Sequence, residues 1–191
     1  MIDISYIVTA CSRPWHLACC LFSIRAQTHS YYEVIVTNNG QTDEQRKEVI
    51  SIVSMVNDSR FRILEGSWEN CYYASEDAVK LATGEYLCFP SDDSYYAPVF
   101  ADKLLASDAD LLICDQAYGA ANHPEYFVLT AGPSVGRIDK TGFLLRRKLF
   151  KSFPNKTPGV QHSISDGEMI VECVQNGASW TRIPEVLSFH N

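Results

Sequence analysis

The stretch that decides the fold is EVIVTNNGQTDEQRKEVISIVSMV, residues 33–56. It opens with a β-branched run at residues 34–36, which predicts a strand, and the turn sequence NNG follows at residues 38–40. Thr42 with Gln45 three residues later has the pattern of a capping box, so we expect a helix to begin there. Apolar residues then recur at helical spacing: Val49, Ile52, Val53 and Val56. The stretch is therefore one β-α unit.

The same alternation extends in both directions along the first half of the chain. Residues 4–8 predict a strand, followed by a helix with Ser12 as its cap and Pro14 in its first turn. Its apolar stripe is Leu17, Cys20, Leu21 and Ile24. Residues 61–64 predict the next strand, and a helix striped by Ala74, Ala78 and Leu81 stops near Gly84. Residues 86–89 predict a fourth strand.

Strands that alternate with helices of this length favour a mixed, mainly parallel sheet with helices on both faces, because parallel neighbours need crossover connections. The length of 191 residues suits one α/β, Rossmann-like domain. In the second half we expect a short helix after Pro98, a strand at 111–114, helices at 144–151 and 166–176, and a strand at 186–190. Residues 118–136 show no pattern that we can assign.

Composition excludes several classes of protein. A net charge of -7 and the lack of a Lys/Arg-rich run argue against nucleic-acid binding. No apolar run approaches the length of about 20 residues that a membrane span needs. The seven cysteines form no CxxC pair and lie mostly in apolar segments, which predicts a reducing, cytoplasmic setting rather than a zinc or redox site.

Polar clusters follow three of the predicted strands, at residues 9–13, 38–40 and 91–94. In a parallel sheet, ligands bind beyond the carboxyl ends of the strands, so we expect the clusters to converge on one crevice. Asp92 and Asp93 are the strongest candidates, because adjacent carboxylates repel unless a positive or hydrogen-bonding group separates them. One would hold Mg²⁺ or Mn²⁺ and the other a ligand hydroxyl. The alternative is a plain Asx turn.

Five ordered segments resemble the family 2 glycosyltransferases of the GT-A fold. YIVTACSRP (6–14) is similar to the family's opening strand and P-T-Y-N-R loop, and EVIVTNNGQTD (33–43) to its E-I-I-V-V-D-D-G-S-T-D segment. LATGEYLCFPSDD (81–93) resembles its A-x-G-E-Y-I segment and DXD-type metal motif. SDGEM (165–169) and PEVLSFHN (184–191) resemble its catalytic acidic pair and its closing strand with a metal-binding His.

The resemblance implies an inverting, metal-assisted transfer of a sugar from a nucleotide diphosphate-sugar, with a UDP-sugar favoured, to a saccharide or other hydroxyl acceptor. The donor would bind to about residues 1–97 and the acceptor to about residues 98–191 of a single domain. The implied roles are donor binding by Thr9, Arg13, Asn39, Asn70 and Asp92, metal binding by Asp93 and His190, and proton abstraction by Asp166. Asn38 and Asn39 stand where the family commonly has acids, which leaves the nucleobase open because an amide both accepts and donates.

Asp166 can also be weighed on local grounds. An Asp before an amphipathic run is often a helix cap, but Ser165 with Glu168 forms a competing capping box. Asp166 would then stand at the first helical position, where the helix terminus favours its anionic form. His162, on the loop before it, is considered for acceptor contact on its loop position alone.

Two rival functions are a nucleotidyltransferase and a non-catalytic nucleotide-sugar binding module. The first would be expected to carry a Gly-rich, basic loop after its first strand, and residues 9–13 contain no glycine. The second differs from an enzyme only in whether Asp166 performs chemistry. The sequence leaves open the sugar, the acceptor and whether the chain is part of a longer protein.

Overall fold

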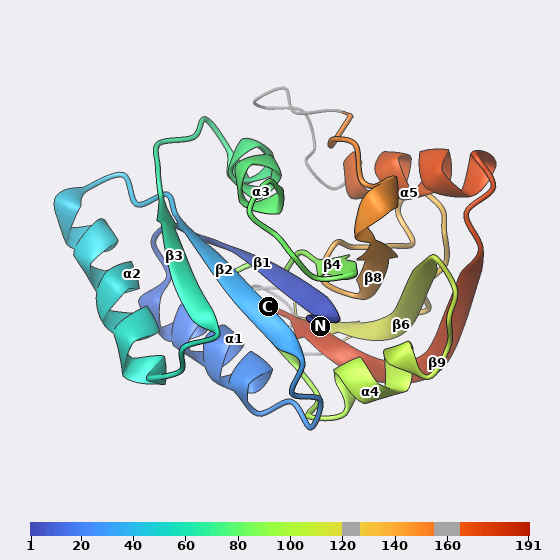
Figure 1. The fold of residues 1–191 in the computed structure, drawn as a ribbon, viewed down its shortest axis with the longest axis horizontal. Coiled ribbons are helices and arrows are strands. Elements are labelled where there is room, and N and C mark those ends of the chain that lie inside the picture. The colour runs from blue at the N-terminus through green and yellow to red at the C-terminus, as the bar shows by residue number, and fades with distance from the viewer. Residues whose placement is uncertain (120–126, 155–164) are drawn as a thin grey trace.

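The structure is a computed structural model that describes residues 1–119, 127–154 and 165–191. Figure 1 shows a single curved sheet with helices above and below it. The elements in chain order are β1 (Ile4–Ala10), α1 (Pro14–Arg25), β2 (Tyr32–Asn38), α2 (Asp43–Val56), β3 (Phe61–Glu65), α3 (Cys71–Val79), β4 (Tyr86–Cys88), β5 (Ser94–Tyr96), α4 (Phe100–Leu105), β6 (Leu111–Tyr118), β7 (Phe127–Leu129), β8 (Phe143–Arg146), the 3₁₀ helix η1 (Arg147–Leu149), α5 (Ser165–Gln175) and β9 (Trp180–His190).

The sheet has the strand order β3-β2-β1-β4-β8-β6-β9-β5, with β7 paired to β6. Strands β3, β2, β1 and β4 are parallel, as are β6 and β9, and these ladders contain most of the paired residues. Strand β8 runs antiparallel to its neighbours β4 and β6, and β5 pairs antiparallel with β9. The prediction of a mixed, mainly parallel sheet is therefore confirmed.

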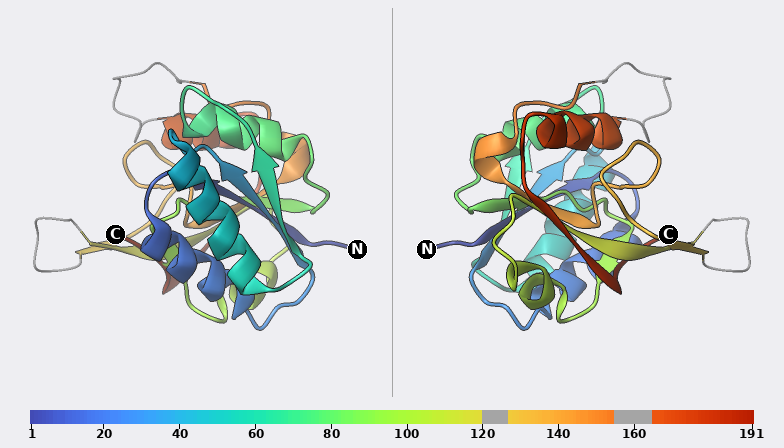
Figure 2. Two further views of the ribbon diagram at one scale, coloured as in Figure 1. Left: turned by 90° about the vertical axis from the view of Figure 1, so that its left-hand side faces the viewer. Right: turned by 90° about the vertical axis from the view of Figure 1, so that its right-hand side faces the viewer.

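Two hydrophobic cores cover the two faces of the sheet. Alternate residues of β1 point to opposite faces, so Tyr6 packs in one core and Ile7 in the other. Helices α1, α2 and α4 contribute to the first core, and α3 and α5 to the second, as the edge-on views of Figure 2 show. The expected placement of helices on both faces is confirmed.

The helix patterns of the first half were read correctly, with two exceptions: the cap of α1, and the end of α3, since Leu81 was expected in its stripe but lies beyond Val79 and is exposed. The buried residues of α1 and α2 are the two apolar stripes predicted for them. Thr42 and Gln45 form the predicted capping box. Ser12 was wrongly expected to cap α1: the cap position is Arg13, which makes no side-chain cap bond, and Pro14 opens the helix with its fixed backbone angle.

The helix expected at residues 144–151 is wrong. Residues from Phe143 to Leu145 are fully buried in β8, between β4 and β6, and only a 3₁₀ turn follows. A central strand covered on both faces reads as a continuous apolar run, which periodicity cannot distinguish from a buried helix.

Strands β6 and β9 are longer than expected, and β9 begins at Trp180 rather than at residue 186. The register explains why Pro184 did not end the strand. Cys114 pairs with Ile183, but Asp115 pairs with Val186, so Pro184 and Glu185 lie in a bulge. A proline that is excluded from the ladder in this way costs no hydrogen bond.

Gly84 has a different role from the one expected. Helix α3 ends at Val79, and Gly84 instead lies against β1, where a Cβ would come within 2.6 Å of the backbone nitrogen of Ser5. Gly84 N donates to Ser5 Oγ at 2.9 Å, so the glycine permits a close approach of two backbones.

None of the helices in the described part of the chain combines the length and apolar character of a transmembrane span.

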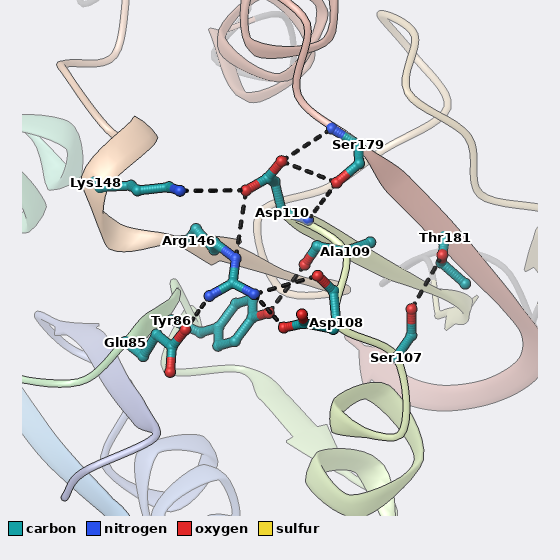
Figure 3. A network of polar contacts seen from close by, with 10 residues as sticks. All are labelled: Glu85, Tyr86, Ser107, Asp108, Ala109, Asp110, Arg146, Lys148, Ser179 and Thr181. Atoms are coloured by element: carbon teal, nitrogen blue, oxygen red, sulfur yellow. Dashed lines mark hydrogen bonds and ion pairs between the residues drawn. The ribbon is translucent and has the colours of Figure 1, made fainter.

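A polar network braces the amino ends of the central strands (Figure 3). The Arg146 guanidinium, at the end of β8, contacts Glu85 before β4 and both Asp108 and Asp110 before β6, and it lies 4.9 Å from the Tyr86 ring centroid. Asp110 also accepts from the backbone and hydroxyl of Ser179, just before β9. One cation thus ties together the starts of three strands.

We predict that Arg146→Met lowers the free energy of unfolding by about 1–3 kcal/mol, because it leaves a cluster of acids without a central donor. Lys148→Met is the matched control. Lys148 reaches the same Asp110 at 3.8 Å, but its side chain is 72% exposed, so we expect a loss below about 0.5 kcal/mol. Urea denaturation of both variants measures the difference, and equal losses would contradict the proposed brace.

Candidate functional site

A cleft of about 470 Å³ opens beyond the carboxyl ends of β1, β2 and β4. Its walls include residues from all three predicted polar clusters: Thr9, Ser12, Arg13, Asn39, Ser91 and Asp92. Thr9 and Ser91 pair in an isolated parallel bridge, which joins the first cluster to the third. The predicted convergence of the clusters on one crevice is confirmed.

Arg13 joins the two adjacent carboxylates of the cleft. Its guanidinium contacts Asp92 through one nitrogen and Asp93 through another, and Cys11 N donates to Asp92 at 3.4 Å. Both aspartates are almost fully buried, whereas the Arg13 side chain is about half exposed. Burial raises the pKa of Asp92, as does Asp93, and the opposing effects of Arg13 and the Cys11 amide do not cancel this.

The two predicted asparagines support the cleft walls. Asn39 exchanges two hydrogen bonds with the backbone of Trp68, donating through Nδ2 at 3.2 Å and accepting through Oδ1 at 3.1 Å. Asn70 caps α3, where its Oδ1 accepts from Tyr72 N at 3.0 Å. Both residues therefore fix the loop and the helix that border the cleft.

His190 lies beside Asp93 because β5 and β9 pair. Strand β5 begins directly after Asp93, and its first residue, Ser94, pairs with His190 at the end of β9. His190 Nδ1 is 3.2 Å from Ser94 Oγ and 3.6 Å from Asp93 Oδ1. The structure thus brings the two predicted metal ligands together.

The donor atoms at this point suit a hard divalent cation. Asp93 Oδ1 is buried and takes part in no hydrogen bond with the described residues. Within those residues no group of three or more His, Cys, Asp or Glu side chains is arranged to hold an ion. Of the described residues, Asp93 and His190 would be the ligands, and an ion there would keep positions open for ligand oxygens.

Asp166 lies near the start of α5, which closely approaches the connection between β7 and β8. A Cβ on Gly167 would come within 2.7 Å of Val135 Cα, so the glycine allows this approach. Lys140 N donates to Asp166 Oδ2 at 3.1 Å, and the Tyr72 side chain faces the carboxylate. Burial, followed by the charge of Asp139, raises the pKa of Asp166 to about 6.

The segment at residues 139–141 was not identified from the sequence. The Asp139 carboxylate accepts from the backbone and hydroxyl of Thr141, at 2.9 and 2.7 Å. Burial tends to raise the pKa of Asp139, but the charge of His190 and hydrogen bonds from Tyr118 and Thr141 lower it overall. The available signal was an Asp-Lys-Thr-Gly sequence at residues 139–142, directly before the apolar run of β8.

Tyr118 shows that the acids share one region. Burial raises the pKa of its hydroxyl, and the charges of Asp139, Asp166 and Asp93 raise it further. Asp166 is linked to the cleft through Lys140, a residue of the cleft wall whose backbone it binds, whereas Asp93 borders a second cavity together with Tyr95 and Asn191. His162 lies outside the described residues.

From the raised pKa of Asp166 we predict how the free energy of unfolding depends on pH. With a folded pKa near 6 against an ordinary value of 3.8, stability due to the protonated carboxyl is lost as the pH rises through 6. In chelator, Asp166→Asn should therefore increase the free energy of unfolding at pH 8 by on the order of 1–3 kcal/mol, with little gain at pH 4.

Asp115→Asn is the matched control, and its effect on the free energy of unfolding should have the opposite sign. Asp115 is also buried, but hydrogen bonds from Arg182 at 2.6 and 2.9 Å and from the Ala131 amide lower its pKa despite burial. Asp115→Asn should lower the free energy of unfolding at pH 8. Its difference from the wild type should become smaller as the pH falls through the lowered pKa of Asp115. Equal destabilisation of both variants at pH 8 would show that ionised Asp166 is not strained.

The sequence profile described as Glycosyl transferase family 2 matches residues 5–159. EpsH of Bacillus subtilis (strain 168), which carries the name of a glycosyltransferase, is 25% identical over 117 residues, covering 60% of this chain and 33% of EpsH. The alignment thus spans about a third of that relative.

Solved structures share the fold. TarS 1-349 of S. aureus superposes with a TM-score of 0.78 at 15% identity, covering 100% of this chain and 60% of TarS 1-349. TarS has also been solved with UDP and with UDP-GlcNAc. The mannosyltransferase PcManGT from Pyrobaculum calidifontis, solved with GDP-Man and Mn²⁺, superposes with a TM-score of 0.74 at 18% identity, covering 98% of this chain and 56% of PcManGT. Because the family profile covers most of the sequence and the fold agrees, this chain belongs to glycosyl transferase family 2 and has the GT-A fold.

Proposed function

We propose that this chain is an inverting glycosyltransferase that moves a sugar from a nucleoside diphosphate donor to an acceptor hydroxyl with the help of a divalent cation. The observation that carries the proposal is the buried Asp166 carboxylate, which binds the backbone of the cleft residue Lys140 and whose pKa burial raises to about 6. A carboxylate with such a pKa is ionised at neutral pH and is a stronger base than an exposed one.

The donor nucleotide would occupy the cleft beyond β1, β2 and β4. Thr9, Arg13 and Asn39 line it, and Asp92 would accept a hydrogen bond from a ribose hydroxyl. Asn70 would help to bind the donor from the start of α3, where it precedes the cleft residue Cys71. A UDP-sugar is the donor we favour, because an Asn39 oxygen can accept from uracil N3–H while keeping its bond to Trp68.

Asp93 and His190 would hold Mn²⁺ or Mg²⁺. The buried Asp93 Oδ1, which takes part in no hydrogen bond with the described residues, and the neighbouring imidazole support this assignment. When bound, such an ion supplies positive charge to the diphosphate of the leaving nucleotide.

Asp166 would act on the acceptor. Its carboxylate accepts the proton of the acceptor hydroxyl while that oxygen forms a bond to the anomeric carbon. The bond from this carbon to the diphosphate breaks on the opposite face, and the nucleoside diphosphate leaves with the bonding electrons. One direct displacement inverts the anomeric centre.

The two parts of the chain would divide the work within a single domain. Most of the cleft lies in residues 1–97, and we assign this part to the donor. Asp139, Asp166 and His190 come from residues 98–191, which we assign to the acceptor and the catalytic base. All seven cysteines are free, which supports a reducing, cytoplasmic location.

A panel of UDP, GDP, CDP and ADP in a thermal-shift assay, with Mn²⁺ or chelator, tests donor binding. We predict that one nucleotide raises the melting temperature with Mn²⁺, since a ligand of the folded state stabilises it. Asp93→Ala should abolish the additional shift that Mn²⁺ produces and leave the shift in chelator unchanged. Retention of the Mn²⁺-dependent shift would rule out Asp93 as a metal ligand.

Asp166→Asn tests catalysis. We predict a fall of about 10²- to 10⁴-fold in release of nucleoside diphosphate from the sugar donor, with the donor Kd changed by less than about threefold. Glu168→Gln, on the same helix turn, is the control and should retain activity. Unchanged turnover in Asp166→Asn would overturn the mechanism, and absence of any turnover in the wild type with a bound donor would favour the non-catalytic binding module.

A further inference from the structure

Lys140 is a buried cation that the function described above does not use. Its residue exposure is 6%, and it lies in the connection between β7 and β8. Its backbone is held by Asp166, and its side chain forms part of the cleft wall, with Nζ 5.7 Å from the Tyr72 ring centroid. The ammonium makes no hydrogen bond or ion pair with any residue in the described ranges.

An ammonium without a partner is costly to bury. Removing it from water costs several kcal/mol, unless a nearby charge or a ligand compensates. Burial tends to lower the pKa of Lys140, but the acidic groups of Cys71, Asp166, Asp139 and Asp92 outweigh it and raise the pKa overall. The lysine therefore stays charged, although its ammonium forms no hydrogen bond or ion pair with these acids.

The position of Lys140 relates the two ends of the proposed site. Asp92, near which the ribose would bind, lines the same cleft as Lys140, and Asp166, which would act on the acceptor, accepts a hydrogen bond from Lys140 N at 3.1 Å. The donor's diphosphate has to lie between the ribose and the sugar. Arg13, the other cation in the cleft wall, is already engaged by Asp92 and Asp93.

We propose that the Lys140 ammonium binds the diphosphate of the nucleotide donor, so that donor affinity depends on a cation of the protein as well as on a divalent ion. This inference rests on the proposed function, because it needs a nucleoside diphosphate in the cleft. Because Arg13 is engaged by Asp92 and Asp93, Lys140 is the cation that the described part of the cleft wall offers to a diphosphate when no metal is bound.

The test is isothermal titration of the wild type, Lys140→Met and Lys140→Arg with UDP, GDP, CDP and ADP, in chelator and in Mn²⁺. For the nucleotide that the wild type binds, Lys140→Met should weaken binding in chelator by about 10- to 100-fold, as expected for loss of a charge-assisted hydrogen bond. Lys140→Arg keeps the charge and should remain within about tenfold of the wild type. Lys148→Met, with its mostly exposed side chain at the far end of the sheet, should not differ from the wild type.

Thermal melts of the same variants without nucleotide separate binding from folding. If Lys140→Met binds the nucleotide as the wild type does in chelator, Lys140 is only a counter-ion for its acidic neighbours, and the inference is overturned while the proposed function stands. If Lys140→Arg loses binding as fully as Lys140→Met although it melts like the wild type, a positive charge at this position is not sufficient for binding, and the inference also fails.

If the wild type binds none of the four nucleotides even with Mn²⁺, the proposed function fails and the inference with it. If Lys140→Met does not fold, the Lys140→Gln variant provides the same comparison.

Discussion

The structure depends on the neutralisation of carboxylates that the fold gathers in one buried region. Asp92, Asp93 and Asp166 are all almost inaccessible, and the charges of Asp93, Asp139 and Asp166 act together on one hydroxyl. Like charges at such short range in a poorly hydrated place destabilise a folded chain unless cations compensate them. Arg13 compensates the first two directly, and Lys140 and His190 act on the others through space.

The topology explains why these residues meet. Parallel strands place the ends of β1, β2 and β4 at one edge, and the bulged strand β9 returns along β6 so that His190 reaches β5 beside Asp93. Gly167 permits α5 to approach the loop that carries Lys140. The network around Arg146 lies where β4, β6 and β9 begin, and none of its residues lines the cleft beyond the carboxyl ends of β1, β2 and β4. The residues that stabilise the sheet around Arg146 and the residues that form the cleft thus lie at opposite ends of the sheet.

The sequence predicted well those features that local patterns determine. The stripes of α1 and α2, the Thr42 cap and the crevice at the strand ends follow from periodicity, capping chemistry and the geometry of parallel sheets. The prediction was wrong at β8, because a strand that is buried on both faces shows no alternation of apolar and polar residues. It was also wrong at the start of β9, because Pro184 lies in a bulge and does not interrupt the strand. The sequence did not predict the burial of Lys140, because no local pattern distinguishes a buried lysine before a strand from an exposed one. Its burial is determined by residues that are distant in the sequence.

The charges of the cleft also limit how a diphosphate can be accommodated. Arg13 contacts both Asp92 and Asp93, so without ligand its charge is already shared between two acids. A diphosphate would add negative charge to a region that contains Asp139 and Asp166 as well, and repulsion would oppose it. Favourable binding therefore requires positive charge beyond Arg13. Among the described residues, the buried Lys140 ammonium could supply it directly, and the Asp93 oxygen beside His190 could supply it through the divalent cation that we propose there. A site with only one of them would leave part of the diphosphate charge without a partner, which is why both are expected to contribute to the same ligand.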